Sequence, residues 1–447
     1  MTPEAGLREG AERDERGGLR GSAGRTPRTD GRGGLRGSAE RTPRTDGRGD
    51  AARLFVGTYT EGTGSEGIYT LAFDAKARRL TVERTTRTLA NPSFLVPWGQ
   101  LVCAAHELPD RGCMATYAVR ADGSLALVDA RATSDDAGTC FVAVHPAGRA
   151  LYGANYQSGS IGCCPLGRGG SLGAPFPSVH HGGHGANPER QEAPHVHTLG
   201  FVPGTSHLVA VDLGIDALTR YRTMETGALA LPPLAVERVP AGSGPRIMAY
   251  HPRLPLAAVV DELANDVLVF HIGEAAAAWT LLGRWNLLGR PEEDGASPET
   301  EATAPSEAEA AAQAAVVGRP TRAGHPTGPA GGASGHDELS PARRTNLAAH
   351  GAFAPDGRRL YVSVRGSDLM VVFDLDREGH ATKRSAFPSG GRGPRHFSLS
   401  PSGELLAVAN QDSGTVALFR LDGEDAPVEV AHAEVPQASC VVWEPQA

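Results

Sequence analysis

Short apolar runs separated by polar turns recur along most of this chain. Seven of them share a pattern: each consists mainly of small and apolar residues and carries polar residues near its end. Runs of this length and composition predict β-strands. These seven runs are RLFVGTYT (53–60), QLVCAAHE (100–107), ALYGANYQ (150–157), HLVAVDLG (207–214), LAAVVDEL (256–263), RLYVSVRG (359–366) and LLAVANQD (405–412).

A second series of apolar runs precedes the first and ends in turns of the Pro-x-Gly type, such as Pro146-Ala147-Gly148. Its last member has no strand after it, and the run at 53–60 has no partner before it. The C-terminal strand is therefore expected to complete the unit that the N-terminal strand begins. The second series is SFLVP (93–97), FVAVHP (141–146), HTLGFVP (197–203), IMAYHP (247–252), GAFAP (351–355), HFSLSP (396–401) and SCVVWEP (439–445).

The spacing of the repeat predicts the fold. The strands of the first series start 47, 50, 57, 49, 103 and 46 residues apart. Units of short strands repeated every ~40–50 residues are typical of β-propellers, whose blades are four-stranded sheets around a central channel. We therefore predict an all-β, seven-bladed β-propeller closed by its C-terminal strand. The one long gap contains residues 291–340, whose removal restores the spacing.

Two segments are expected to lie outside this fold. Residues 1–50 repeat RGGLRGSA-x-RTPRTDG at 16–31 and 32–47 and contain almost no large apolar residues. Residues 291–340 are rich in Ala, Gly and Pro and contain no aromatic residue. Neither segment can bury enough apolar surface to offset the entropy lost on ordering, so we expect both to be disordered. Residues 51–447 are expected to form a single propeller.

Composition narrows the class of protein further. The net charge of −8 argues against nonspecific nucleic-acid binding, and no apolar run approaches the ~18 residues of a membrane helix. The N-terminal residues contain no apolar core of a secretion signal, so the six cysteines are interpreted as reduced thiols. We expect a cytoplasmic monomer that binds neither nucleic acid nor membrane.

Blade geometry predicts where unusual side chains gather. Strands within a blade alternate in direction, so the starts of the first strands and the ends of the second strands share one face. The tripeptide Gly-Pro-Arg stands just before a first strand at 244–246 and again at 393–395, and is expected to direct each Arg into the channel mouth. The other candidates on this rim are Glu107, Asn155, Asp212, Glu262, Arg365, Asn410 and Gln411 at strand ends, and His195, His197 and His396 at strand starts.

A ring of Arg, His and carboxylates suits a small anionic substrate. Arg binds phosphate or carboxylate through two parallel hydrogen bonds, and Glu or His can act as a general base. Asp and Asn at strand ends also cap turns, so a structural role is an equal expectation for Asn155, Asp212 and Glu107. The histidines at 180, 181, 184, 195 and 197 match no established zinc spacing, and we expect neither a metal nor a cofactor.

Several of these segments resemble a known family. They are ERQEAPHVH (189–197), VDLGID (211–216), GPRIMAYHP (244–252), VVDELANDV (259–267), GPRHFSLSP (393–401), VGTYTEGTGSEGIYTL (56–71) and ANYQSGSI (154–161). They resemble the lactonase family of seven-bladed propellers, which includes propeller-type 6-phosphogluconolactonases and is related to fungal carboxymuconate-lactonising enzymes. The resemblance runs from about residue 53 to 445.

The resemblance implies a site of one His, two Arg and one Glu. In this sequence these fall on His195 or His197, Arg246, Glu262 and Arg365. The blade geometry adds, as substrate-binding candidates, Arg395, His396, Asn155, Asp212, Asn410 and Glu107. Family members often carry Glu-Ile-His where this chain has His350-Gly351-Ala352, so the sixth blade is expected to lack its usual acid and His.

Three functions are compatible with these residues. The first is hydrolysis of a sugar lactone, 6-phosphogluconolactone above all, with His195, His197 or Glu262 as the base that activates water and Arg246 and Arg365 on the substrate's negative charge. The second is cycloisomerisation of a muconate-type dicarboxylate on the same residues. The third is a non-enzymatic propeller that binds a ligand or a protein at its rim, because a fold does not fix a function.

Overall fold

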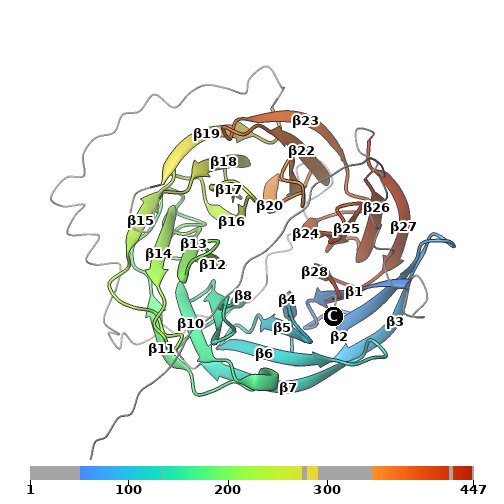
Figure 1. Cartoon of the computed structure of the whole chain (residues 1–447), viewed down its shortest axis with the longest axis horizontal. Helices are drawn as coiled ribbons and strands as arrows, with labels where there is room; N and C mark the ends of the chain where they lie inside the picture. Colours follow the sequence, from blue (N-terminus) through green and yellow to red (C-terminus); the bar gives the residue numbers. More distant parts are fainter. Residues whose placement is uncertain (1–50, 134, 274–278, 290–344, 422–425, 445–447) are drawn as a thin grey trace, which may run out of the picture. The chain divides into compact units, whose positions relative to one another are not determined.

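The computed structural model describes residues 51–133, 135–273, 279–289, 345–421 and 426–444. The disorder expected for residues 1–50 and 291–340 lies outside these residues. The described residues form seven antiparallel sheets of four strands each, arranged around a central channel (Figure 1), and a single short 3-10 helix, η1 (Arg168–Gly170). The predicted seven-bladed β-propeller is confirmed.

The four strands of each blade run from the channel to the periphery. The innermost strands, from blade 1 to blade 7, are β28 (Ala438–Trp443), β4 (Pro92–Trp98), β8 (Thr139–Val144), β12 (Val196–Phe201), β16 (Pro245–Tyr250), β20 (Leu347–Phe353) and β24 (Pro394–Leu399). The second strands are β1 (Ala51–Thr58), β5 (Leu101–His106), β9 (Ala150–Asn155), β13 (His207–Asp212), β17 (Leu256–Asp261), β21 (Arg359–Arg365) and β25 (Leu405–Asn410).

The two outer positions complete each sheet. The third strands are β2 (Gly67–Asp74), β6 (Gly112–Val119), β10 (Ser160–Pro165), β14 (Ala217–Arg222), β18 (Asp266–His271), β22 (Leu369–Leu375) and β26 (Thr415–Arg420). The outermost strands are β3 (Arg79–Arg87), β7 (Leu125–Thr133), β11 (Phe176–His180), β15 (Ala235–Arg238), β19 (Thr280–Asn286), β23 (Ala381–Pro388) and β27 (Val428–Glu434). Outermost strands such as β3 and β7 are the most exposed, as edge strands are expected to be.

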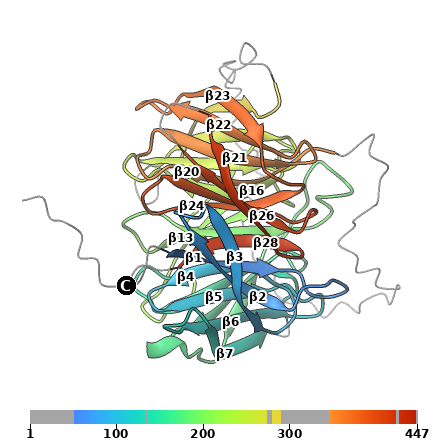
Figure 2. The ribbon, with the colours of Figure 1, turned by 90° about the vertical axis from the view of Figure 1, so that its right-hand side faces the viewer.

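The C-terminal strand completes the N-terminal blade, as predicted from the unpaired strand at each end of the repeat. β28 pairs with β1 from Leu54 opposite Trp443 to Thr58 opposite Ala438, so residues from both ends of the described chain share one sheet. The red β28 and the blue β1 lie side by side in Figures 1 and 2. Hydrogen bonds between β28 and β1 join the two ends of the described chain within blade 1 and thereby close the ring.

The core is divided among the seven blade-to-blade interfaces. Each interface holds one cluster of buried apolar side chains, drawn from both neighbouring sheets. Between blades 1 and 7, for example, Leu54 and Val56 pack with Ala407 and Leu418. Because both faces of a blade are covered, the second and third strands are almost continuously apolar rather than alternating. No helix of the described residues is long and apolar enough to cross a membrane.

Candidate functional site

Every innermost strand starts with a β-bulge that turns one side chain into the channel. In blade 5, Pro245 pairs with Asp261 and Ile247 with Val260, which leaves Arg246 as the extra residue. A bulge of this kind re-aims the side chain that it inserts. The equivalent residues, which we call the bulge ring, are Ser439, Ser93, Cys140, His197, Arg246, His350 and Arg395 in blades 1 to 7. All seven line one pocket in the channel.

A second ring comes from the second strand of each blade. Its member is the residue that follows the partner of the innermost-strand residue just before the bulge. We call these residues the rim ring: Tyr59, Glu107, Tyr156, Leu213, Glu262, Arg365 and Gln411 in blades 1 to 7. They stand next to the bulge ring because the two strands are hydrogen-bonded neighbours. The repeat therefore defines fourteen equivalent positions around the channel, and the seven of the bulge ring line the pocket.

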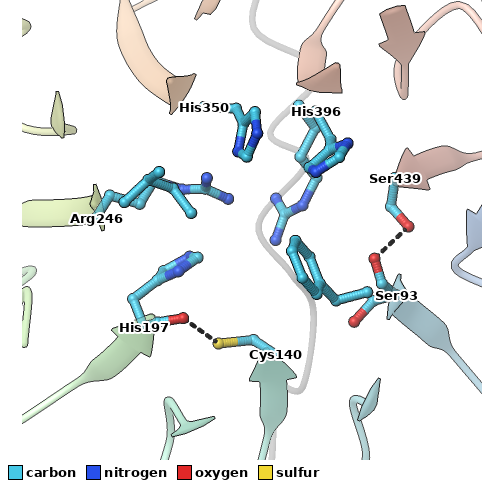
Figure 3. Close-up of a pocket in the computed structure, with 10 residues that line it drawn as sticks. Ser93, Cys140, His197, Arg246, His350, His396 and Ser439 are labelled. Carbon is cyan, nitrogen blue, oxygen red and sulfur yellow. Dashed lines mark hydrogen bonds between the residues drawn. The ribbon is translucent and has the colours of Figure 1, made fainter. Parts of the chain in front are cut away.

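The two sides of the pocket differ in the size and charge of their side chains. Blades 4 to 7 contribute the large basic or imidazole side chains His197, Arg246, His350 and Arg395, whereas blades 1 to 3 contribute Ser439, Ser93 and Cys140 (Figure 3). The free volume at this level is only about 10 Å³, which is space for roughly one water molecule. The space among the bulge-ring side chains is therefore too small for any ligand larger than a water molecule unless side chains move.

Glu262 is the centre of an arginine cluster. Its Oε2 lies 2.8 Å from Nη2 of Arg365 and 2.8 Å from Nε of Arg246, although the Arg246 N–H is not aligned as a hydrogen bond. Its Oε1 accepts a 2.6 Å hydrogen bond from Nη2 of Arg190, and Arg246 also donates from Nη1 to the backbone oxygen of Ala349. The carboxylate thereby fixes three guanidinium groups at one side of the mouth.

The charges of this cluster decide the protonation state of Glu262. Burial by itself would raise the pKa of Glu262, but Arg365, Arg246 and Arg190 outweigh it and hold that pKa far below its ordinary value. Burial, followed by the nearby Arg365 and Arg395, lowers the pKa of Arg246 to about 9, which still leaves it charged at pH 7. A permanently ionised carboxylate bound by three guanidinium groups is a counter-ion and a weak base.

A fourth guanidinium lies on the other side of the mouth. Arg395 donates to the hydroxyl of Tyr59 over 2.8 Å, and this hydroxyl donates to Oε2 of Glu107 over 2.6 Å. The same Oε2 accepts a 3.0 Å hydrogen bond from Ser93. Glu107 and Arg395 belong to different blades, so the Tyr59 hydroxyl connects them across blade 1. Together the two clusters hold four guanidinium groups against two carboxylates, an excess of positive charge that suits an anionic ligand.

Three histidines in the pocket are neutral at pH 7. Burial, helped by the positive charge of Arg246, lowers the pKa of His396 to about 3 and the pKa of His197 well below 6.5. Burial and the neighbouring His396 have the same effect on the pKa of His350, whose ring centre lies 4.0 Å from that of His396. In His197, Nδ1 is buried without a hydrogen-bond partner among the described residues. The unprotonated imidazole of His197, in blade 4, is the neighbour on the bulge ring of Arg246, in blade 5.

The structure brings together most of the side chains that the sequence singled out. His197, Arg246, Arg395 and His396 line the pocket. Glu262 and Arg365 contact Arg246 or each other at its mouth, and Glu107 belongs to the Arg395 cluster. The sixth blade, in which the sequence lacks the Glu-Ile-His of the family, contributes His350 to the pocket wall from a bulge of two residues.

Four other candidates lie outside the pocket. His195 stacks on Tyr156 with ring centres 4.3 Å apart, and its ring nitrogens face the backbone oxygen of Tyr156 and Glu192. Asn155 is hydrogen-bonded to Thr139 and Ser160, and Asn410 donates to the backbone oxygen of Ser389. Asp212 accepts from the backbone nitrogens of His195 and Gly214 and pairs with His181 at 2.6 Å. These contacts fit a structural role, and not ligand binding, for Asn155, Asp212 and Asn410.

Asn155, Asp212 and Asn410 lie outside the pocket because each stands one position away from a rim-ring residue. Side chains alternate between the two faces of a strand, so neighbouring positions point in opposite directions. Asn155, Asp212 and Asn410 each precede a rim-ring residue by one position and end the regular pairing of the second strand. They are fully or almost fully buried within their own blades.

A substitution at Asp212 separates the two interpretations. Asp212→Asn keeps the shape but replaces one acceptor oxygen by an NH2 donor, which then faces either the two backbone N–H groups or Nδ1 of His181. We expect the free energy of unfolding to fall by about 1–3 kcal/mol, the penalty for a buried group left unsatisfied, with no change in KM for the ligand. Denaturant unfolding and steady-state kinetics measure the two effects. A raised KM at unchanged stability would show instead that Asp212 takes part in ligand binding.

Sequence reasoning missed several residues of the site. Tyr59, Ser93, Cys140, His350 and Ser439 occupy the same repeat positions as Glu262 or Arg246, so alignment of the seven units on Gly-Pro-Arg would have found them. Arg190 lies in the segment between β11 and β12, outside the repeated strands, and only its place within ERQEAPHVH marked it. Among the described residues, no group of three or more His, Cys, Asp or Glu side chains could hold a metal ion.

Comparison with known proteins places the chain in a family. The model of the family "Lactonase, 7-bladed beta-propeller" matches residues 53–312 and 325–443. The chain is 27% identical over 398 residues to the 6-phosphogluconolactonase of Bacillus subtilis, covering 87% of this chain and 97% of that protein. Among solved structures, the periplasmic gluconolactonase of Pseudomonas aeruginosa superposes with a TM-score of 0.70 at 25% identity, covering 88% of this chain and 99% of that one. A protein from Lactobacillus plantarum has the same fold, with a TM-score of 0.71 at 24% identity and coverage of 88% and 100%. The chain belongs to the lactonase family of seven-bladed β-propellers.

Proposed function

We propose that this protein hydrolyses the internal ester of a sugar lactone, with 6-phosphogluconolactone as the best candidate substrate. The observation that carries the proposal is a neutral, buried His197 next to Arg246 in a pocket with excess positive charge. The 6-phosphogluconolactonase from Bacillus subtilis and the gluconolactonase from Pseudomonas aeruginosa support the reaction class, because both names describe the hydrolysis of sugar lactones.

In the proposed mechanism His197 is the general base. Its unprotonated imidazole takes a proton from a water molecule whose oxygen adds to the lactone carbonyl carbon. The bond between that carbon and the ring oxygen then breaks, and the ring oxygen takes the proton back from the imidazolium. Of the three bases that the sequence left open, His195 faces Tyr156 and Glu192, and Glu262 is held as a counter-ion. His197 is the group left in the pocket.

Arg246 supplies the electrostatic part of the mechanism. It lies on the bulge ring beside His197, and its charge can stabilise the oxyanion that forms when water adds to the carbonyl. Such preorganised charge gives the largest contribution in many enzymes. Glu262 acts as a positioning residue, because its carboxylate holds Arg246 and Arg365 in place before the substrate arrives.

The pocket favours water over a covalent nucleophile. Ser93 donates its hydrogen bond to Glu107, and Ser439 donates to the backbone oxygens of Gly57 and Ser93. Burial raises the pKa of the Cys140 thiol far above its ordinary value, so the thiol stays protonated and unreactive. Among the described residues neither Ser439 nor Cys140 is hydrogen-bonded to a side-chain base, which nucleophilic catalysis by serine or cysteine requires. The one carboxylate next to Ser93, that of Glu107, also accepts a shorter hydrogen bond from Tyr59.

The direct test is the hydrolysis rate of 6-phosphogluconolactone with purified protein, measured against spontaneous hydrolysis. Parallel assays with glucono-δ-lactone and with a carboxymuconate distinguish the alternatives. We expect turnover of the lactones. Turnover of the carboxymuconate alone would establish the cycloisomerase instead, and no turnover of any of them would favour a binding propeller.

The pH profile tests the proposed base. Because burial and Arg246 depress the pKa of His197, the imidazole stays unprotonated below pH 6.5, the ordinary pKa of histidine. We therefore expect kcat/KM at pH 6 to equal its value at neutral pH and to fall only in more acidic solution. Glucono-δ-lactone is the substrate to use, since a phosphate group titrates near pH 6 itself. An acid limb centred at or above pH 6.5 would contradict the assignment.

A further inference from the structure

Two of the side chains that line the pocket carry a charge at pH 7. The three imidazoles there are neutral because burial lowers their pKa values, and the serines and the protonated thiol are neutral as well. The two charged groups are Arg246 in blade 5 and Arg395 in blade 7, on either side of His350 in blade 6. The positive charge of the pocket wall therefore comes from this pair of arginines.

Arg395 is the guanidinium group that the protein leaves most open. The other three guanidinium groups of the mouth contact the carboxylate of Glu262. No carboxylate of the described residues forms an ion pair with Arg395, whose Nη2 donates to the Tyr59 hydroxyl over 2.8 Å. Nε and Nη1 of Arg395 have no hydrogen-bond partner in the described part of the chain, and neither atom is completely buried. Both remain available to a small ligand in the pocket.

The imidazole of His197 points into the same space (Figure 3). Its Nε2 has no hydrogen-bond partner within the described ranges and, unlike Nδ1, is not completely buried. The free volume of about 10 Å³ is that of roughly one water molecule. The charges of Arg246 and Arg395 act together with burial to lower the pKa of His197, which shows that both guanidinium groups are within electrostatic reach of the imidazole.

The hydroxyl and thiol donors of the pocket are already used by the protein. Ser93 donates to a carboxylate, Ser439 donates to backbone oxygens, and Sγ of Cys140 lies 3.5 Å from the backbone oxygen of His197. The N–H groups of the two arginines are therefore the charged donors left for an oxygen atom in this space. Such an oxygen can accept from Arg395 while it donates to the imidazole of His197.

We propose that Arg395 is a further catalytic residue, which binds the hydrolytic water molecule next to His197 and, together with Arg246, stabilises the hydroxide that forms from it. One proton of the water passes to the imidazole, and the electron pair stays on the oxygen that then adds to the lactone carbonyl carbon. Tyr59 is a positioning residue, because its hydroxyl holds one end of the Arg395 guanidinium. The inference rests on the proposed lactonase function and adds the site of its nucleophile.

Replacing Arg395 by Gln tests this role with glucono-δ-lactone as substrate. We expect kcat to fall by about 10²- to 10³-fold, the effect of removing one preorganised donor. Loss of the positive charge should also raise the pKa of His197, so the acid limb of the pH profile should move to higher pH. The other charged groups near His197 remain in this variant: Arg246, Arg365 and Glu262.

The matched control is Arg392→Gln, which removes an exposed arginine from the same loop before β24 and should change neither kcat nor the acid limb. Tyr59→Phe keeps the charge of Arg395 and should lower kcat by a smaller factor. Combined with Arg395→Gln it should cause no further loss, since both changes act on one interaction. A raised KM with kcat and the acid limb unchanged in Arg395→Gln would overturn the inference, because Arg395 would then bind only the substrate.

A measurement without turnover separates this inference from the proposed function. Fluoride is isoelectronic with hydroxide and is a probe for a site that holds one oxygen atom between two guanidinium groups. In fluorine NMR titrations we expect fluoride to bind the wild-type protein, and to bind Arg395→Gln at least tenfold more weakly than Arg392→Gln. That result without lactone hydrolysis would support the hydroxide site and refute the lactonase. Lactone hydrolysis by the wild type, with kcat and fluoride binding unaffected in folded Arg395→Gln, would refute the inference alone.

Discussion

A His197→Gln protein is expected to hydrolyse its lactone with a kcat about 10²- to 10⁴-fold lower than wild type, the range that one general base contributes. Glutamine has a similar volume and can hydrogen-bond to water, but it cannot accept a proton. Arg246 and the other guanidinium groups remain, so KM should change little. Stopped-flow or coupled assays, corrected for spontaneous hydrolysis, measure the loss. The acid limb of the pH profile should disappear along with the rate.

His350→Gln is the matched control for this experiment. His350 lies on the same ring, its imidazole is also neutral because of burial, and it is close to Arg246, but the mechanism gives it no proton to carry. We expect it to retain most of the wild-type kcat. Thermal unfolding of both variants shows whether the pocket is intact. Equal losses of kcat in two folded variants would contradict His197 as the base.

The fold was readable from the sequence because it is repeated. Seven copies of one strand pattern average out local ambiguity, and an unpaired strand at each end of the series leaves one simple closure. The rim was found for the same reason, since alternation of strand direction puts equivalent strand ends on one face. The orientation of single side chains was not readable to the same degree. Asn155, Asp212 and Asn410 differ from rim-ring residues by one position, and one position reverses the direction of a side chain.

The bulges explain the remaining differences between the site predicted from the sequence and the site in the structure. A bulge adds one residue to a strand, so two consecutive residues such as Arg395 and His396 can both line the pocket although strict alternation separates them. Apolar periodicity carries no signal for that extra residue. In blade 6 the bulge holds two residues, Ala349 and His350, and the strand pattern gives no signal that His350 lines the pocket. Arg190 was beyond prediction because its position depends on tertiary hydrogen bonds of Gln191 and Asn187.

Replacing Glu262 by Gln is expected to have the largest effect on stability, a loss of about 3–5 kcal/mol in the free energy of unfolding at pH 7. Gln cannot neutralise any of the three guanidinium groups that contact this side chain, so their repulsion in a buried site is left uncompensated. Urea unfolding measures the change. Glu83→Gln is the matched control, because Glu83 pairs with Arg53 at 37% exposure and such pairs contribute about 1 kcal/mol or less.

The pH dependence of that loss identifies its cause. The folded-state pKa of Glu262 is depressed below the value of about 4.3 that it has in the unfolded chain. Its ionisation therefore stabilises the folded protein fully above the unfolded pKa, and this contribution declines as the pH falls towards the folded pKa. The unfolding free energies of wild type and Glu262→Gln should differ most at neutral pH and converge below about pH 4. A difference that stays constant between pH 7 and pH 3 would show that packing of the side chain, and not its charge among the arginines, holds the mouth of the channel together.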